Sequence, residues 1–302
     1  MSGQPTSSEV PLPHASTDPT VIPRSPRVWA VDLFRIVFDL NRQQTWLEAR
    51  QERLIAHCDD VEQQHLICDL LYRFHFVRAS EVPERMKEFA NYLVDTLHID
   101  PEQTAITALA KGHYSDSSQY IAWLTKAALA NRPGWSTTEF LSTLSAAVNE
   151  VKKGKTRIVV VDEFVGSGKT VVNAVGWLNK QLAAESLKAD IVVAAIVGMT
   201  DGIGKVMGAG IEIHCQHILK KGISQHFTGA DLTQAISAMK ALEGKLSNES
   251  NNRKLADMSF GFAGSESLYF LEGGNPPNNV FPIFWWKHLK GDIARETILE
   301  RV

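Results

Sequence analysis

The stretch RIVVVDEFVGSGKT, residues 157–170, limits the fold of this chain more than any other segment. Its residues 158–161 are all β-branched and predict a buried strand, because they present apolar side chains to both faces of a sheet. Asp162 and Glu163 follow directly, and a glycine-rich turn then opens a helix predicted over Thr170–Glu185. A buried strand that leads through a tight turn into a helix is typical of α/β proteins with a parallel sheet.

The glycine-rich turn has the composition of a phosphate-binding loop. Glycine lets the backbone turn tightly and approach a ligand, and the free N–H groups at a helix start attract an anion. Two hydroxyls add hydrogen-bond donors and one lysine adds positive charge. The candidate phosphate-binding residues are Gly166, Ser167, Gly168, Lys169 and Thr170.

An alternative interpretation of this turn is the P-loop of nucleoside triphosphatases. That motif requires a glycine five residues before the glycine of Gly-Lys-Thr. Glu163 occupies that position here, and its carboxylate would repel the phosphates. We retain the P-loop only as an alternative.

The adjacent acids favour a different ligand, a ribose that carries a 5-phosphate. Asp162 and Glu163 can accept hydrogen bonds from two cis hydroxyls of the ribose while the turn holds its phosphate. We therefore treat the two acids as the candidate catalytic residues.

Strands and helices alternate on both sides of this stretch. The remaining predicted strands are Thr104–Ala110, Ile191–Val197 and Ile211–Cys215, and the remaining predicted helices are Gln119–Ala130 and Thr137–Lys152. Strands that are apolar on both faces and alternate with helices predict a parallel sheet covered on both sides. Ligands of such sheets lie beyond the carboxyl ends of the strands.

Composition and periodicity predict four parts in the chain. Residues 1–27 hold six of the 12 prolines and read as a disordered tail that could tether a protein partner. Residues 28–100 read as a helical subdomain, residues 101–230 as the α/β core, and residues 231–302 as a C-terminal helix with a base-side segment.

Charge and cysteine content narrow the cellular setting. Lys and Arg number 31 against 34 Asp and Glu, so the net charge of -3 gives no overall attraction to nucleic acid. The three cysteines are too scattered for a disulfide framework, which predicts a cytoplasmic protein. The longest apolar run, residues 191–197, is far shorter than the roughly 20 residues of a membrane span, so we expect no membrane association.

The twelve residues 159–170 resemble the signature of the type I phosphoribosyltransferase family without a gap. The resemblance implies a type I phosphoribosyltransferase-like parallel sheet flanked by helices, with an N-terminal helical subdomain and a hood-like C-terminal segment. It also implies that Asp162 and Glu163 hold the ribose hydroxyls of phosphoribosyl pyrophosphate or of a nucleotide 5-phosphate. Mg²⁺ would bridge pyrophosphate and ribose oxygens, with no direct protein ligand.

The same resemblance implies a pyrophosphate loop after the first core strand. The candidates lie within residues 110–118 and are Lys111, Gly112 and Ser115. An ordinary polar loop between a strand and a helix, with Ser117 or Ser118 as the N-cap, remains the alternative.

The C-terminal segment GGNPPNNVFPIFWW, residues 273–286, resembles the closing motif of divergent phosphoribosyltransferase-like proteins of bacterial conflict and defence systems. Asparagine can pair with a base edge and tryptophan can stack on a base. The base-side candidates are Asn275, Asn278, Asn279, Trp285 and Trp286. The alternative is that the prolines and tryptophans are packing residues at a domain edge.

One departure from the family pattern leaves the activity open. Purine-salvage enzymes carry an acid in the phosphate loop at the position of Gly166. We therefore expect either magnesium-dependent transfer or cleavage at ribose C1, as the effector of a defence or toxin system, or a catalytically inactive nucleotide sensor of the same fold. Other components of a defence operon and a second copy of the chain are the expected protein partners.

Overall fold

The computed structural model of the protein describes residues 37, 39–47, 50–110, 116–136 and 138–301. The predicted tail, residues 1–27, lies outside these ranges, as do the predicted pyrophosphate-loop residues Lys111, Gly112 and Ser115. The division of the chain into four parts stays a prediction.

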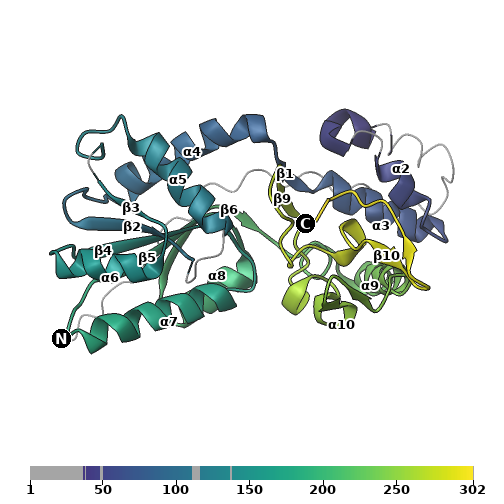
Figure 1. Cartoon of the computed structure of the whole chain (residues 1–302). Helices are drawn as coiled ribbons and strands as arrows, with labels where there is room; N and C mark the ends of the chain where they lie inside the picture. The colour runs from purple at the N-terminus through teal and green to yellow at the C-terminus, as the bar shows by residue number, and fades with distance from the viewer. Residues whose placement is uncertain (1–36, 38, 48–49, 111–115, 137, 302) are drawn as a thin grey trace, which may run out of the picture.

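A five-stranded parallel sheet forms the centre of the molecule, as the alternation of strands and helices predicts (Figure 1). Its strand order is β3-β2-β4-β5-β6, and all four neighbouring pairs are parallel. The strands are β2 (Thr104–Ala108), β3 (Phe140–Leu141), β4 (Arg157–Val165), β5 (Asp190–Met199) and β6 (Glu212–Leu219). This arrangement is consistent with a phosphoribosyltransferase fold.

Helices cover both faces of the sheet, since the interior residues of β4 and β5 are apolar on both sides. Hydrophobic side chains of α4 and α5 pack on one face, and those of α6, α7 and α8 pack on the other (Figure 1). The helices are α4 (Val82–Asn91), α5 (Ser117–Leu129), α6 (Leu144–Lys152), α7 (Lys169–Ala184) and α8 (Thr200–Gly208).

Two elements of the sheet differ from the prediction. The helix expected over Thr137–Lys152 is wrong in its first half, because Phe140 and Leu141 pair with β2 and extend the sheet as β3. The helix α6 begins only at Leu144, after the N-cap residue Thr143. In addition, β4 continues through the acid pair to Val165. Asp162 and Glu163 therefore lie within the last residues of the strand and not after it.

A second lobe joins the two ends of the described chain. Residues from 40 to 74 and from 223 to 299 share one hydrophobic cluster, in which α3 packs against α9 (Figure 1). A parallel pair of short strands, β1 (His75–Val77) and β9 (Tyr269–Leu271), lies next to it. The α-helices of this lobe in the described residues include α2 (Arg50–Ile55), α3 (Val61–Tyr72), α9 (Gly229–Glu243) and α10 (Leu255–Met258).

Short elements complete the described chain. The remaining strands are β7 (Glu249–Ser250), β8 (Arg253–Lys254), β10 (His288–Leu289) and β11 (Ile293–Ala294). The short turns are 3-10 helical at Thr45–Leu47, Ala79–Glu81, Phe262–Gly264 and Pro282–Phe284, and π-helical at Tyr92–Thr96.

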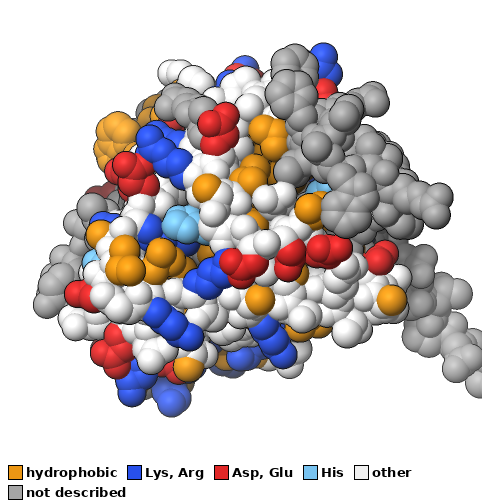
Figure 2. Space-filling view, turned by 90° about the vertical axis from the view of Figure 1, so that its right-hand side faces the viewer, with side chains coloured by type: hydrophobic (Ala, Val, Ile, Leu, Met, Phe, Trp, Pro, Cys, Tyr) orange, Lys and Arg blue, Asp and Glu red, His pale blue; other side chains and the backbone are white. Residues whose placement is uncertain are grey.

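The surface carries charges of both signs. Figure 2 shows the face of the second lobe, on which several Asp and Glu side chains lie in a row across the middle with Lys and Arg side chains mostly below them, and hydrophobic side chains form only small groups. None of the helices in the described residues has both the length and the hydropathy that a membrane span requires.

The contact between α3 and α9 generates a prediction about stability. Leu70 on α3 is completely buried in the shared cluster, so Leu70→Ala should lower the free energy of unfolding by about 2–5 kcal/mol. Urea denaturation measures the change. Ile293→Ala, at a side chain that is 60% exposed, serves as the control and should have almost no effect. Equal losses for both variants would contradict the shared core.

Candidate functional site

A cavity of about 660 Å³ lies at the carboxyl ends of β2 and β4, where the fold class places ligands. Four parts of the chain form its wall: the two strand ends, the start of α5, the phosphate loop with the first turn of α7, and C-terminal residues between 262 and 279. The predicted site residues that line it are Asp162, Glu163, Gly166, Ser167, Gly168, Lys169, Thr170, Asn275, Asn278 and Asn279. The structure therefore brings together the acid pair, the phosphate loop and the asparagines.

Asp162 contributes a buried carboxyl group to this wall. Its side chain accepts a hydrogen bond from the Glu163 N–H at 2.8 Å. Burial raises the pKa of Asp162 well above its usual value, and the nearby charge of Asp116 raises it further. Asp162 therefore takes up a proton at higher pH than an exposed aspartate does.

Glu163 is also buried, and its pKa is shifted in both directions. Burial raises the pKa of Glu163, while the hydroxyls of Tyr269 and Ser117 lower it in part. Among the described residues neither Glu163 nor Asp162 forms an ion pair. Both side chains belong to the cavity wall, as binding of ribose hydroxyls requires.

The phosphate loop has the backbone that an anion site needs. Gly168 is the N-cap of α7 and adopts a left-handed conformation with φ of 72°, which favours glycine. No side chain caps this helix start. The N–H groups of its first turn are therefore available to an anion in the cavity, beside Lys169 and Thr170.

Glycine is required in the loop for a second reason, close packing. A Cβ atom on Gly166 would lie 2.3 Å from the Cγ and Oδ1 atoms of Asn279. On the other side, a Cβ atom on Gly202 of α8 would lie 2.0 Å from the Gly166 carbonyl oxygen. The loop therefore fits between α8 and the C-terminal segment, and an acid at position 166 has no room.

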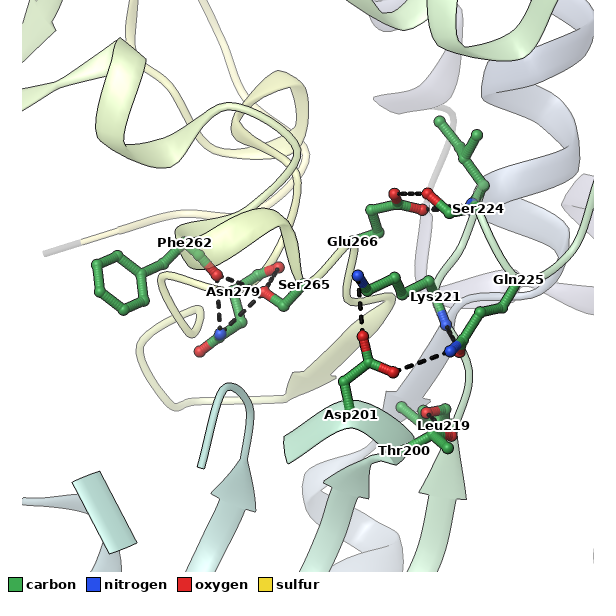
Figure 3. A network of polar contacts seen from close by, with 11 residues as sticks. Thr200, Asp201, Leu219, Lys221, Ser224, Gln225, Phe262, Ser265, Glu266 and Asn279 are labelled. Atoms are coloured by element: carbon green, nitrogen blue, oxygen red, sulfur yellow. Dashed lines mark hydrogen bonds and ion pairs between the residues drawn. The ribbon is translucent and has the colours of Figure 1, made fainter. Parts of the chain in front are cut away.

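The C-terminal segment is held over the loop by a small network of polar contacts. The Asn279 side chain donates hydrogen bonds from Nδ2 to the Ser265 hydroxyl at 2.8 Å and to the Phe262 carbonyl at 3.3 Å (Figure 3). Glu266 accepts from the backbone N–H groups of Ile223 and Ser224 at 2.8 and 2.7 Å, which fixes the residues before β9, including Ser265, to the chain beyond β6. Asn279 is thus fixed in the cavity wall next to the phosphate loop.

The two tryptophans do not reach this cavity. Trp285 and Trp286 are buried in the hydrophobic cluster of the second lobe. The Trp285 indole donates to the Val280 carbonyl, and the Trp286 indole donates to the Ser247 hydroxyl. The expectation that they stack on a base is corrected, because their rings already contribute to packing.

Between β2 and α5 the structure describes residues 109–110 and residue 116. Asp116 is the N-cap of α5, with Gln119 completing a capping box, so the expectation of Ser117 or Ser118 as the cap is wrong. Asp116 and Ser117 both line the cavity. The sequence does contain a signal for this cap, because Gln119 follows Asp116 after three residues at the start of the helix.

Several further cavity residues were not expected from the sequence. Asn173 lies one helical turn beyond Thr170 on α7, a spacing that places both on one face. Phe262 lies between α10 and β9, Pro277 lies in the C-terminal segment, and only tertiary packing brings them to the strand ends. Gly202 on α8 is not among the residues that line the cavity, but it packs closely against the Gly166 backbone, and this approach is visible only in the structure.

A smaller cavity of about 190 Å³ shares Gly166 and Ser167 with the large one. Asp201 at its edge pairs with the Lys221 ammonium at 2.9 Å and accepts from the Gln225 side chain at 2.9 Å (Figure 3). This network joins the start of α8 to the chain beyond β6, next to the C-terminal segment.

The sequence pattern of the PRTase-CE family matches residues 47–301. The chain belongs to the PRTase-CE family. Members of this family are phosphoribosyltransferase-like effectors of conflict systems. The matched residues include the acid pair, the phosphate loop and all five base-side candidates.

Comparison with other proteins adds little to the family assignment. A solved structure described as a hypothetical protein from Neisseria gonorrhoeae with bound ppGpp is 13% identical, with a TM-score of 0.32. The match covers 56% of this chain and 97% of that chain. No curated protein matches the chain.

The close packing of the loop predicts that Gly166→Ala destabilises the fold by about 1–3 kcal/mol, because the added methyl group meets Asn279. In an Asn279→Ala background, which removes the three contacting atoms, the same substitution should cost less. Gly176→Ala in α7 is the matched control, since no atom lies within 4 Å of its added Cβ. Equal costs of Gly166→Ala in both backgrounds would contradict the contact.

The buried Glu243 side chain predicts that the stability of the folded protein depends on pH. Its buried side chain accepts hydrogen bonds from the Ser259 hydroxyl and the Phe260 N–H, next to the cavity residue Phe262. Burial raises the pKa of Glu243 from 4.5 to about 7. The folded state therefore binds more protons than the unfolded state within this window, and stability falls as pH rises through it.

Removing that carboxyl group should remove its share of the pH dependence. Between pH 4.5 and 7 the wild type should lose up to about 3 kcal/mol more than Glu243→Gln, whose side chain does not titrate. Urea denaturation at several pH values measures the difference. Parallel stability curves for the two proteins would show that Glu243 does not titrate in this range.

Proposed function

We propose that the cavity binds phosphoribosyl pyrophosphate or a nucleotide 5-phosphate. The observation that carries the proposal is that Asp162 and Glu163 line the same cavity as the phosphate loop. The two acids accept the ribose hydroxyls, and the N–H groups at the start of α7 hold the 5-phosphate with Lys169. Asn275, Asn278 and Asn279 face the remaining part of the ligand.

The proposed reaction breaks the bond between ribose C1 and the leaving group. The leaving pyrophosphate, or the base of a nucleotide, takes the bonding electron pair, and a base or water adds to C1. This chain would contribute by holding the sugar while positive charge develops on it, next to the carboxyl groups of Asp162 and Glu163.

Mg²⁺ fits the proposal as an ion carried by the ligand. Within the described residues no group of three or more His, Cys, Asp or Glu side chains is arranged to hold a metal ion. The proposal therefore assigns the ion to the oxygens of pyrophosphate and ribose, which are hard ligands of the kind magnesium prefers. Bound there, it would neutralise the charge of the leaving pyrophosphate.

A nucleotide sensor of the same fold is the second candidate. One observation favours it: the Asn279 carboxamide occupies the space in which an acid at position 166 would lie. The chain then has no carboxyl group at that place to exchange protons with a base. Such a protein would bind the same ligand and leave the bond at C1 intact.

Calorimetry with phosphoribosyl pyrophosphate and Mg²⁺ tests the binding. The Asp162→Asn/Glu163→Gln double variant should bind at least about tenfold more weakly, because it loses hydrogen bonds to carboxylates. Glu249→Gln/Asp257→Asn makes the same chemical changes at exposed positions outside the cavity and should bind like the wild type. Equal affinity of the double variant and the wild type would remove the proposal.

Product analysis then separates the candidates. Release or consumption of pyrophosphate with any base or with water indicates an enzyme, and binding without turnover indicates a sensor. Phosphate release from ATP that is lost in Lys169→Ala would instead support the P-loop alternative. Protein partners and a second copy of the chain stay predictions.

A further inference from the structure

The orientation of the Asn279 carboxamide follows from its two hydrogen-bond partners. A backbone carbonyl can only accept, so the side-chain atom that bonds to the Phe262 carbonyl at 3.3 Å must be the nitrogen. The Ser265 hydroxyl donates to the same carbonyl at 2.8 Å and therefore accepts from this nitrogen, also at 2.8 Å. The Oδ1 atom of Asn279 is the end that points away from both partners (Figure 3).

The backbone around this side chain is fixed as well. The Asn279 carbonyl accepts from the Ser267 N–H at 3.0 Å, and the Asn278 carbonyl accepts from the Phe262 N–H at 2.8 Å. The carboxamide packs so closely on Gly166 that a Cβ atom there would overlap it. The Oδ1 atom thus has a defined place beside the phosphate loop.

This oxygen keeps its capacity to accept a hydrogen bond. Within the described chain, both hydrogen bonds of the Asn279 side chain are donated by Nδ2. Asn279 lines the large cavity, so a bound ligand meets an acceptor that the protein does not use. Covering such an acceptor without giving it a donor is unfavourable. The part of the ligand next to Asn279 therefore has to supply an N–H or O–H group.

The base is the part of the ligand that meets this requirement. Phosphate oxygens are acceptors and carry negative charge, so they would repel Oδ1. The ribose hydroxyls are donors, but the proposed function places them on Asp162 and Glu163. An N–H group of a base remains as the partner for this oxygen.

We propose that Asn279 is a specificity-determining residue of the cavity: its Oδ1 atom accepts a hydrogen bond from an amino or ring N–H group of a nitrogenous base. This inference rests on the proposed function and names the substrate class, a nucleotide or free base that carries such a donor. The contact selects the base without taking a proton from it, because a carboxamide does not titrate in the physiological pH range.

Calorimetry with nucleoside 5-phosphates tests the preference for a donor. AMP and IMP are compared with purine riboside 5-phosphate, which lacks the amino group and the ring N–H. CMP and UMP are compared with pyrimidin-2-one riboside 5-phosphate, which lacks the same groups. At least one donor-bearing nucleotide should bind the wild type about three- to tenfold more tightly than its reference. Equal affinity within every comparison would overturn the proposal.

Two variants assign the preference to Asn279. In Asn279→Ala the preference should disappear, because the acceptor is gone, whereas Asn279→Asp keeps an acceptor oxygen of similar shape and should keep the preference. Asn131→Ala, at an exposed position after α5 and outside the cavity, is the matched control and should bind like the wild type. In Asn279→Ala, weaker binding of all ligands with an unchanged preference would indicate a purely structural role and overturn the proposal.

A measurement on the unaltered protein keeps the proposal falsifiable if Asn279→Ala does not fold. Carbon-13 NMR of labelled full-length protein follows the side-chain carbonyl carbon of Asn279, assigned through its own backbone resonances. The preferred nucleotide should move this resonance to higher frequency by more than its reference does, because only the nucleotide donates to Oδ1. Equal shifts with both ligands would overturn the proposal.

Phosphoribosyl pyrophosphate separates failure of this inference from failure of the proposed function. If the protein binds it with Mg²⁺ but binds no nucleotide, or binds nucleotides without a preference, the proposed function stands and only the inference about Asn279 fails. If neither phosphoribosyl pyrophosphate nor any nucleoside 5-phosphate binds, both fail together.

Discussion

The close approach of the phosphate loop to its two neighbours is the constraint on which the rest of the site depends. The Gly166 backbone lies against Gly202 on one side and against the Asn279 side chain on the other. No side chain larger than hydrogen fits at either glycine without a shift. The loop, the start of α8 and the C-terminal segment must therefore fold together, and the cavity forms only when all three are in place.

This constraint explains how a chain with an ordinary α/β sheet acquires a specific cavity. The sheet supplies the acid pair and the helix start, as many folds of this class could. The C-terminal segment supplies the opposite wall, and the second lobe holds that segment through the cluster shared by residues 40–74 and 223–299. Packing in the second lobe, far from the acids along the chain, thus contributes to the geometry around them.

The parts of the site that are local in sequence were predictable. Asp162, Glu163 and the loop lie within nine residues, so the strand and the turn alone bring them to one edge of the sheet. The parallel sheet followed from the apolar runs of β4 and β5 for the same reason. Asn279 was expected from the resemblance of residues 273–286 to a family motif, but its contact with Gly166 joins residues more than one hundred positions apart and required the structure.

The failures also have physical causes. Trp285 and Trp286 have rings that suit either a base or a core, and only the second lobe decides that they are buried. The two residues of β3 form a strand because β2 offers a free edge, which no local pattern shows.

The structure of a complex with phosphoribosyl pyrophosphate and Mg²⁺ tests the central claim most directly. The account predicts both ribose hydroxyls within about 2.5–3.2 Å of the carboxyl oxygens of Asp162 and Glu163. The 5-phosphate should lie on the N–H groups of residues 166–170. A ligand bound with its phosphates on that loop but its ribose turned away from both acids would contradict the account.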